Sequence, residues 1–419
     1  MKPENAYTTG IFTVGMLFFI CGFTTWLNAV LIPYLKVACE LNNFQAYFVT
    51  LVFYLACAAV IFPTLRLLRQ ADHASVMVIG LMLVTAGALI FIPAALLRTY
   101  PLFLLSLLVA GAGVGLLHAA AGIGLSAYGG GGAMRRRTAM NACGKAAGAL
   151  GLLAIGGVLF RNIDGLEASI RMAEGASRAA ELDTLSHKIV LPCLAIALSL
   201  LAATFWVKFA PLPSVAAENS GARREEKAQR SGGPHLLRLW LGGLALFLFA
   251  GAEVVGIVSI ALYGKSAGMS LEAAKALPAC SLLAAILGCL LSAALVPKHI
   301  CRERTLAVCA ALGVIFSVAA VSAPGWLSLA FVALLAMAAA PVWPFVFSLT
   351  AKAGRGDRAS AAMLSAGALG GALLPLAYGY LADAVGARQA YWILAPCYAF
   401  ILLYAVANLP SAGEAKAKK

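Results

Sequence analysis

Three ionisable side chains lie deep within long apolar stretches of the sequence: His118, Lys145 and Glu253. A charge near the centre of a bilayer costs at least ~2.5–3.5 kcal/mol, so such residues are candidates for a function. Lys145 can bind a carboxylate or phosphate group, or it can extend its ammonium toward the cytoplasm as a packing residue. Glu253 can pair with Lys145, a ligand or a proton. His118 titrates near neutral pH in water and is a second candidate for carrying a proton. The alternative for His118 and Glu253 is a structural hydrogen bond.

Four neutral side chains could contact a small polar molecule. Asn28 and Gln45 can hydrogen-bond hydroxyl groups, although Gln45 could equally cap the helix that it begins. Trp26 and Trp343 can stack on a ring, or they can simply pack. The substrate-binding candidates are Trp26, Asn28, Gln45, His118, Lys145 and Glu253, and the proton-coupling candidates are His118 and Glu253.

Sequence patterns of enzymes and cofactor sites are missing. We find no nucleophile with an adjacent base, so we predict no catalytic residues and no enzymatic activity. Neither a Walker nor a Rossmann glycine pattern occurs, and no cysteines or histidines have metal-ligand spacing. We therefore expect no cofactor and no metal, and any transport must be driven by gradients.

The composition places these residues in a membrane. Of 419 residues, 62% are hydrophobic and 11% are charged, whereas a soluble protein has about 45–50% apolar and roughly 25% charged residues. This excludes a soluble enzyme, a disordered chain and a fibrous protein. Twelve apolar runs are long enough to be helices that cross a bilayer, which predicts an all-α integral membrane protein. They cover roughly 10–35, 46–68, 75–97, 101–128, 139–160, 189–209, 238–263, 276–296, 305–323, 326–350, 360–382 and 389–409.

Polar segments divide the twelve spans into two halves. We predict a six-helix half at 1–210, a cytoplasmic linker at 211–236, a second six-helix half at 237–410 and a basic cytoplasmic tail at 411–419. The segment 161–188 is predicted to be a solvated external loop, with a short amphipathic helix around 166–182 as the alternative.

The basic residues indicate the orientation. Lys and Arg are more than twice as frequent on the side of the two termini as on the other side, which places both termini in the cytoplasm and the chain in the cytoplasmic (inner) membrane. The net charge of +14 then reflects contact with anionic lipid rather than nucleic acid.

Two six-span halves joined by a basic loop resemble the plan of the major facilitator superfamily. Short motifs are similar to those of one branch, the fucose–galactose–glucose:proton symporter family, whose members are relatives of bacterial L-fucose permease. These motifs are FFICGF at 18–23, LNAVLIPYLK at 27–36, FQA at 44–46, GAEV at 251–254, PFVFSL at 344–349 and GGALLP at 370–375.

The sequence departs from that family at its polar positions. The resemblance implies an aspartate where Ala29 stands and an acidic residue where His118 stands. It implies polar amides where Ala139, Ala142 and Lys145 stand. Proton coupling and sugar specificity are therefore not carried over from the family.

The resemblance implies a secondary transporter with a site near the midplane between the halves, working by alternating access. We expect a small polar solute, either a monosaccharide or a derivative, and an anionic solute stays open because of Lys145. The alternatives are an exporter or exchanger of a small organic anion or carboxylate chelator, and a non-transporting membrane receptor on a transporter fold. The expected partners are the substrate, a proton or another ion, and membrane lipids, with no nucleic acid and a monomeric chain.

Overall fold

The structure is a computed structural model that describes residues 3–127, 133–210, 234–299, 302–351 and 357–409. Twelve of its helical segments are long and apolar enough to cross a membrane, which confirms the predicted number and places of the spans. Most of the predicted linker, residues 211–233, and the tail at 411–419 lie outside the described residues.

The N-terminal half contains the first six spans. Its helices are α1 (Pro3–Trp26), α2 (Asn28–Ala38), α3 (Asn43–Ala46), α4 (Phe48–Gln70), α5 (His73–Leu96), α6 (Tyr100–Ala127), α7 (Ala133–Leu159), α8 (Ile163–Met172), α9 (Gly175–His187) and α10 (Val190–Phe209). The first span consists of α1 and α2, and the second begins with the single turn α3.

The C-terminal half contains the other six spans. Its helices are α12 (Pro234–Val258), α13 (Ile260–Ser266), α14 (Leu271–Ala274), α15 (Leu277–His299), α16 (Arg302–Ser322), α17 (Gly325–Ala339), α18 (Val342–Ala351), α19 (Asp357–Val385), α20 (Ala387–Ala390), the 3-10 helix Tyr391–Ile393 and α21 (Leu394–Ala407).

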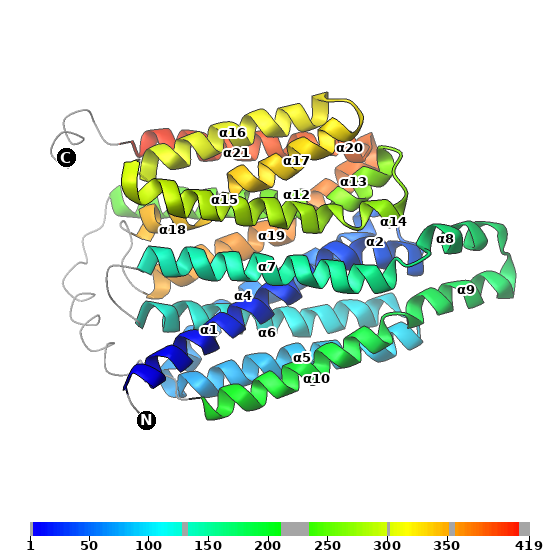
Figure 1. The fold of residues 1–419 in the computed structure, drawn as a ribbon, viewed down its shortest axis with the longest axis horizontal. Helices are drawn as coiled ribbons and strands as arrows, with labels where there is room; N and C mark the ends of the chain where they lie inside the picture. Colours follow the sequence, from blue (N-terminus) through cyan, green and yellow to red (C-terminus); the bar gives the residue numbers. More distant parts are fainter. Residues whose placement is uncertain (1–2, 128–132, 211–233, 300–301, 352–356, 410–419) are drawn as a thin grey trace.

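The long helices of both halves run side by side (Figure 1). We call the end at which α1 begins and α21 ends the terminal end, and the opposite end, where α8 and α9 project, the loop end. Large apolar side chains such as Phe205, Trp240 and Leu403 are exposed on the outer surface, as expected of a surface that meets lipid tails.

Small residues allow the helices to approach closely. A Cβ atom on Gly22 of α1 would lie 2.1 Å from the carbonyl oxygen of Gly144 on α7. Glycines are used in this way in membranes because helix association there depends on close van der Waals packing.

The prediction of a solvated loop between the fifth and sixth spans is wrong. Residues 163–172 and 175–187 form the two helices α8 and α9. Four apolar side chains of these two helices are buried, Ile163, Ile170, Leu182 and Leu185, and their apolar contacts stabilise the helices.

Candidate functional site

A cavity of about 320 Å³ lies between the two halves. It is lined by α1, α4, α6 and α7 of the N-terminal half and by α12, α18 and α19 of the C-terminal half. This volume is within the usual range of small-molecule pockets, about 300–1,000 Å³.

Four of the six predicted binding residues line this cavity: Trp26, His118, Lys145 and Glu253. Each comes from a different helix, and Glu253 alone comes from the C-terminal half. The structure thus brings four of the predicted residues together in one cavity shared by both halves.

The other two predicted residues lie outside the lining. Asn28 is buried at the start of α2, and its amide group donates a hydrogen bond to the carbonyl oxygen of Thr25 at 2.9 Å. Gln45 completes a capping box with Asn42 at the start of α3, through hydrogen bonds of 2.7 and 3.1 Å. The structure therefore places Gln45 as a helix cap, which was the alternative to a binding role.

Lys145 and Glu253 form an ion pair and hydrogen bond across the two halves, between Nζ and Oε1. The side chain of Lys145 is 3% exposed and that of Glu253 is 16% exposed. The ammonium group also lies 5.4 Å from the ring centroid of Trp26. Lys145 thus points to Glu253 instead of extending toward the membrane surface.

His118 lies on the wall formed by α6. Its ring makes an edge-on contact with Phe18 at a centroid distance of 6.2 Å, and both rings line the cavity. Phe18, Trp26 and His118 thus contribute three rings to the part of the lining that comes from the N-terminal half.

Besides Thr25, Tyr54 and Ser360, the polar lining residues that were not predicted from the sequence include Arg137 and Asn141 on α7. They stand eight and four positions before Lys145, and this spacing places all three on one face of α7. The guanidinium group of Arg137 lies 4.5 Å from the ring centroid of Phe347 on α18, so this contact also joins the halves. Their spacing of four and eight residues from Lys145 in the sequence could have indicated that they share its face of the helix.

The lining extends toward the terminal end. Leu65 lies near the last turn of α4, Arg137 near the first turns of α7, and Ser360 in the first turn of α19. Each of these helix ends is at the terminal end of the molecule (Figure 1).

Polar contacts close the loop end. Asp383 of α19 accepts hydrogen bonds from the backbone N–H groups of Asn43 at 3.1 Å and Phe44 at 2.8 Å. Asp164 of α8 accepts them from Leu271 at 3.0 Å and Glu272 at 3.3 Å. Each aspartate thus binds the first turn of a span in the other half.

An ion pair adds to this closure. Lys265 at the end of α13 contacts both carboxylate oxygens of Glu167 on α8, each at 2.7 Å. Helix α8 therefore contributes two acidic side chains to contacts with the C-terminal half.

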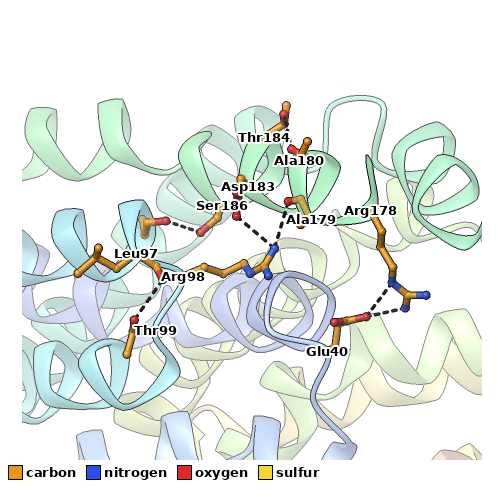
Figure 2. A network of polar contacts seen from close by, with 11 residues as sticks. Glu40, Leu97, Arg98, Thr99, Arg178, Ala179, Ala180, Asp183, Thr184 and Ser186 are labelled. Carbon is orange, nitrogen blue, oxygen red and sulfur yellow. Dashed lines mark hydrogen bonds and ion pairs between the residues drawn. The ribbon is translucent and has the colours of Figure 1, made fainter. Parts of the chain in front are cut away.

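The α8–α9 segment is itself held to the N-terminal half by α9 (Figure 2). Arg98 pairs with Asp183 at 3.1 Å and donates to the carbonyl oxygen of Ala179 at 3.2 Å. Arg178 pairs with Glu40 at 2.5 Å. Because α9 is fixed in this way, we expect the acidic residues of α8 to move with the N-terminal half.

No group of three or more His, Cys, Asp or Glu side chains that could hold a metal ion occurs among the residues that the structure describes. The chemistry available in the cavity is hydrogen bonding, stacking and charge contact.

A sequence model of the major facilitator superfamily matches residues 14–364, which is most of the chain. The chain belongs to the major facilitator superfamily. It is 29% identical over 413 residues to a glucose/galactose transporter of Brucella abortus biovar 1 (strain 9-941), covering 96% of this chain and 95% of that protein. It is 24% identical over 404 residues to the L-fucose-proton symporter of Escherichia coli (strain K12), covering 93% of this chain and 90% of that protein. These relatives confirm the predicted resemblance.

Solved structures support the same fold. The crystal structure of the superfamily transporter FucP in the outward conformation aligns with a TM-score of 0.71 at 21% identity, covering 97% of this chain and all of that chain. A D-xylose-proton symporter aligns with a TM-score of 0.61 at 15% identity, covering 95% and 97%. As a superfamily member with twelve apolar spans, the chain is a multi-pass membrane protein.

Proposed function

We propose that the chain is a secondary transporter that moves a monosaccharide across the cytoplasmic membrane by alternating access. The observation that carries the proposal is the cavity between the halves, which combines the ring of Trp26 with the hydrogen-bonding groups of Lys145 and Glu253. The relatives named glucose/galactose transporter cover nearly the whole chain and favour the same substrate class. The named functions of these relatives also support a carrier rather than an enzyme.

The charge at the Lys145–Glu253 pair favours a neutral sugar over an anionic solute there, and Arg137, the other charged side chain of the described lining, lies against the ring of Phe347. The positive charge of Lys145 is compensated by Glu253 in direct contact. An anion that used Lys145 would have to displace a buried carboxylate, which would leave Glu253 without a counter-charge. A neutral sugar can hydrogen-bond to both members of the pair and leave it intact.

Orientation follows from the basic residues. The excess of Lys and Arg in the segments predicted to lie on the side of the two termini supports a cytoplasmic location for both termini. With this orientation, the contacts made by Asp164 and Asp383 close the outer end, and the cavity extends toward the cytoplasm. We further propose that residues 1–210 and 237–410 move as two halves of a monomer.

The experiment is uptake by purified protein in liposomes of known lipid. Beside a labelled sugar acid, labelled D-glucose, D-galactose and L-fucose are each tested for entry and for counterflow against the same unlabelled sugar. We expect saturable, stereospecific entry of at least one of them. Liposomes without protein and the variant Trp26→Ala are the controls. Binding of a sugar with no flux would favour the receptor alternative, and entry of sugar acids alone would favour the anion alternative.

A further inference from the structure

Glu253 is the one carboxylate among the described residues that line the cavity. A carrier that moves a proton with its solute needs a group in the cavity that gains the proton on one side of the membrane and releases it on the other. The position of Glu253, within the seventh span and in contact with Lys145 near the middle of the fifth, suits that role. The ion-pair partner of Glu253 opposes that role, because Lys145 already supplies the positive charge that a bound proton would bring.

Several groups surround Glu253, and Lys145 is the one basic group that the structure records in contact with it. Tyr54 on α4, Cys289 on α15 and Tyr398 on α21 lie within electrostatic range of the carboxylate, and each is neutral at physiological pH. His118 on α6 and Arg137 on α7 line the same cavity. The residues of α18 and α19 in the lining are apolar except for Ser360.

Protonation of Glu253 would leave the ammonium group of Lys145 buried without a counter-charge. Burying an uncompensated charge is far more costly than burying a pair, so the contact between Lys145 and Glu253 favours the state in which both are charged. The pair also lies where the two halves meet near the midplane, and rocking of the halves around a fixed site displaces facing residues least there. The contact can therefore persist whichever end is open.

We propose that Lys145 takes the place of a co-transported proton, so that the protein carries its sugar without proton coupling. This proposal rests on the proposed function. Lys145 neutralises Glu253 permanently, and no proton crosses the membrane with the solute. The protein is then a uniporter, and a neutral residue at position 145 would allow Glu253 to bind a proton and couple it to transport.

The test uses full-length protein in liposomes that contain a fluorescent pH indicator. D-glucose, D-galactose or L-fucose is added outside, and sugar entry and internal pH are followed together. For the wild type we expect sugar entry without internal acidification, and no accumulation above the external concentration when the interior is made alkaline. For Lys145→Met we expect acidification that accompanies sugar entry, and accumulation of up to about tenfold per pH unit of the imposed gradient.

Two variants are the controls. Lys145→Arg keeps the positive charge and is expected to stay uncoupled. The double variant Lys145→Met with Glu253→Gln has no carboxyl group to protonate. Both substitutions change the binding site, so sugar entry is expected to be slower than in the wild type, but the entry that remains should occur without acidification, which separates coupling from proton leak.

Sugar-dependent acidification in the wild type would overturn the proposal, and its loss in His118→Gln would identify His118 as the carrier instead. Uncoupled transport by Lys145→Met would also overturn it. The wild-type measurement needs no variant and therefore decides even where Lys145→Met does not fold. The absence of any flux of the three sugars is a different result. It would contradict the proposed function of sugar transport, on which the proposal of uncoupled transport rests.

Discussion

Asp164 and Asp383 hold equivalent places in the two halves. Asp383 ends the fifth span of the C-terminal half, and Asp164 follows the fifth span of the N-terminal half. Each carboxylate accepts backbone N–H groups at the start of the second span of the opposite half. The N-terminus of a helix carries a partial positive charge and free N–H groups, so each contact is favourable. Opening of the loop end requires both contacts to break.

We predict that the double variant Asp164→Asn with Asp383→Asn opens the loop end more often. Each substitution removes a negative charge from a helix N-terminus, worth about 0.3–1 kcal/mol, while the side chain keeps its size. The measurement is the distance between spin labels at the exposed positions Glu174 and Gln389, by pulsed electron resonance, in a variant without native cysteines. We expect a larger population at long distances.

The matched control is Asp183→Asn. Asp183 also pairs at the loop end, with Arg98, but both residues belong to the N-terminal half. We expect no change in the distance between the labels. An equal shift in the control and the double variant would mean that general loosening, rather than the loss of contacts between the halves, causes the opening.

The buried ion pair leads to a prediction about stability. Glu253→Gln leaves the ammonium group of Lys145 without a counter-charge, and breaking a buried pair in this way costs about 3–5 kcal/mol. Replacement of both residues, by Lys145→Met and Glu253→Gln, should cost much less. Thermal unfolding in detergent checks this order. A double variant less stable than Glu253→Gln would show that packing, not charge, dominates at this position.

Trp26 is expected to affect binding. Its ring lines the cavity next to the ion pair, where it can stack on the face of a sugar. Trp26→Ala should raise the KM for sugar entry several-fold, from the loss of an aromatic contact worth about 0.5–1.5 kcal/mol. The control is Trp206→Ala, because Trp206 is half exposed on the outer surface at α10 and lies outside the lining. An unchanged KM in Trp26→Ala would show that the ring of Trp26 does not contribute to sugar binding.

The contact between Gly22 and Gly144 can be tested by adding one methyl group. Gly22→Ala would place a carbon 2.1 Å from a backbone oxygen, so α1 and α7 must separate. We expect a loss of about 1–3 kcal/mol in stability, as for other overpacked positions. Gly157→Ala is the matched control in the same helix as Gly144, because nothing lies within 4 Å of its added Cβ. The apparent Tm should fall for Gly22→Ala and stay constant or rise for Gly157→Ala.

The spans could be predicted from the sequence because a helix in lipid must be apolar over its whole length, and that property is local. The helices α8 and α9 were harder to predict, because they are stabilised by burial of a few apolar residues, Ile163 and Ile170 on α8 and Leu182 and Leu185 on α9, with polar residues between them. Hydropathy alone does not record such tertiary contacts.

The site could be predicted in part for the same reason. Lys145 and Glu253 are conspicuous because charge is rare in the spans, but their pairing depends on how the two halves face each other. Asn28 is polar in an apolar run, yet its amide nitrogen donates to the backbone of Thr25, one turn earlier at the junction of α1 and α2. Its buried carbonyl oxygen has no hydrogen-bond partner among the residues that the structure describes. The spacing of Asn42 and Gln45 is a capping pattern that can be recognised in sequence.

The neutrality of the Lys145–Glu253 pair has an electrical consequence. A membrane potential acts on moving charge with about 2.3 kcal/mol per elementary charge per 100 mV. A pair without net charge, carrying an uncharged sugar past it, moves no charge through that field. We therefore expect the rate of entry to be independent of voltage and the direction to follow sugar concentration alone. A cell that relies on such a carrier retains its sugar only by a reaction that converts it to a form unable to leave.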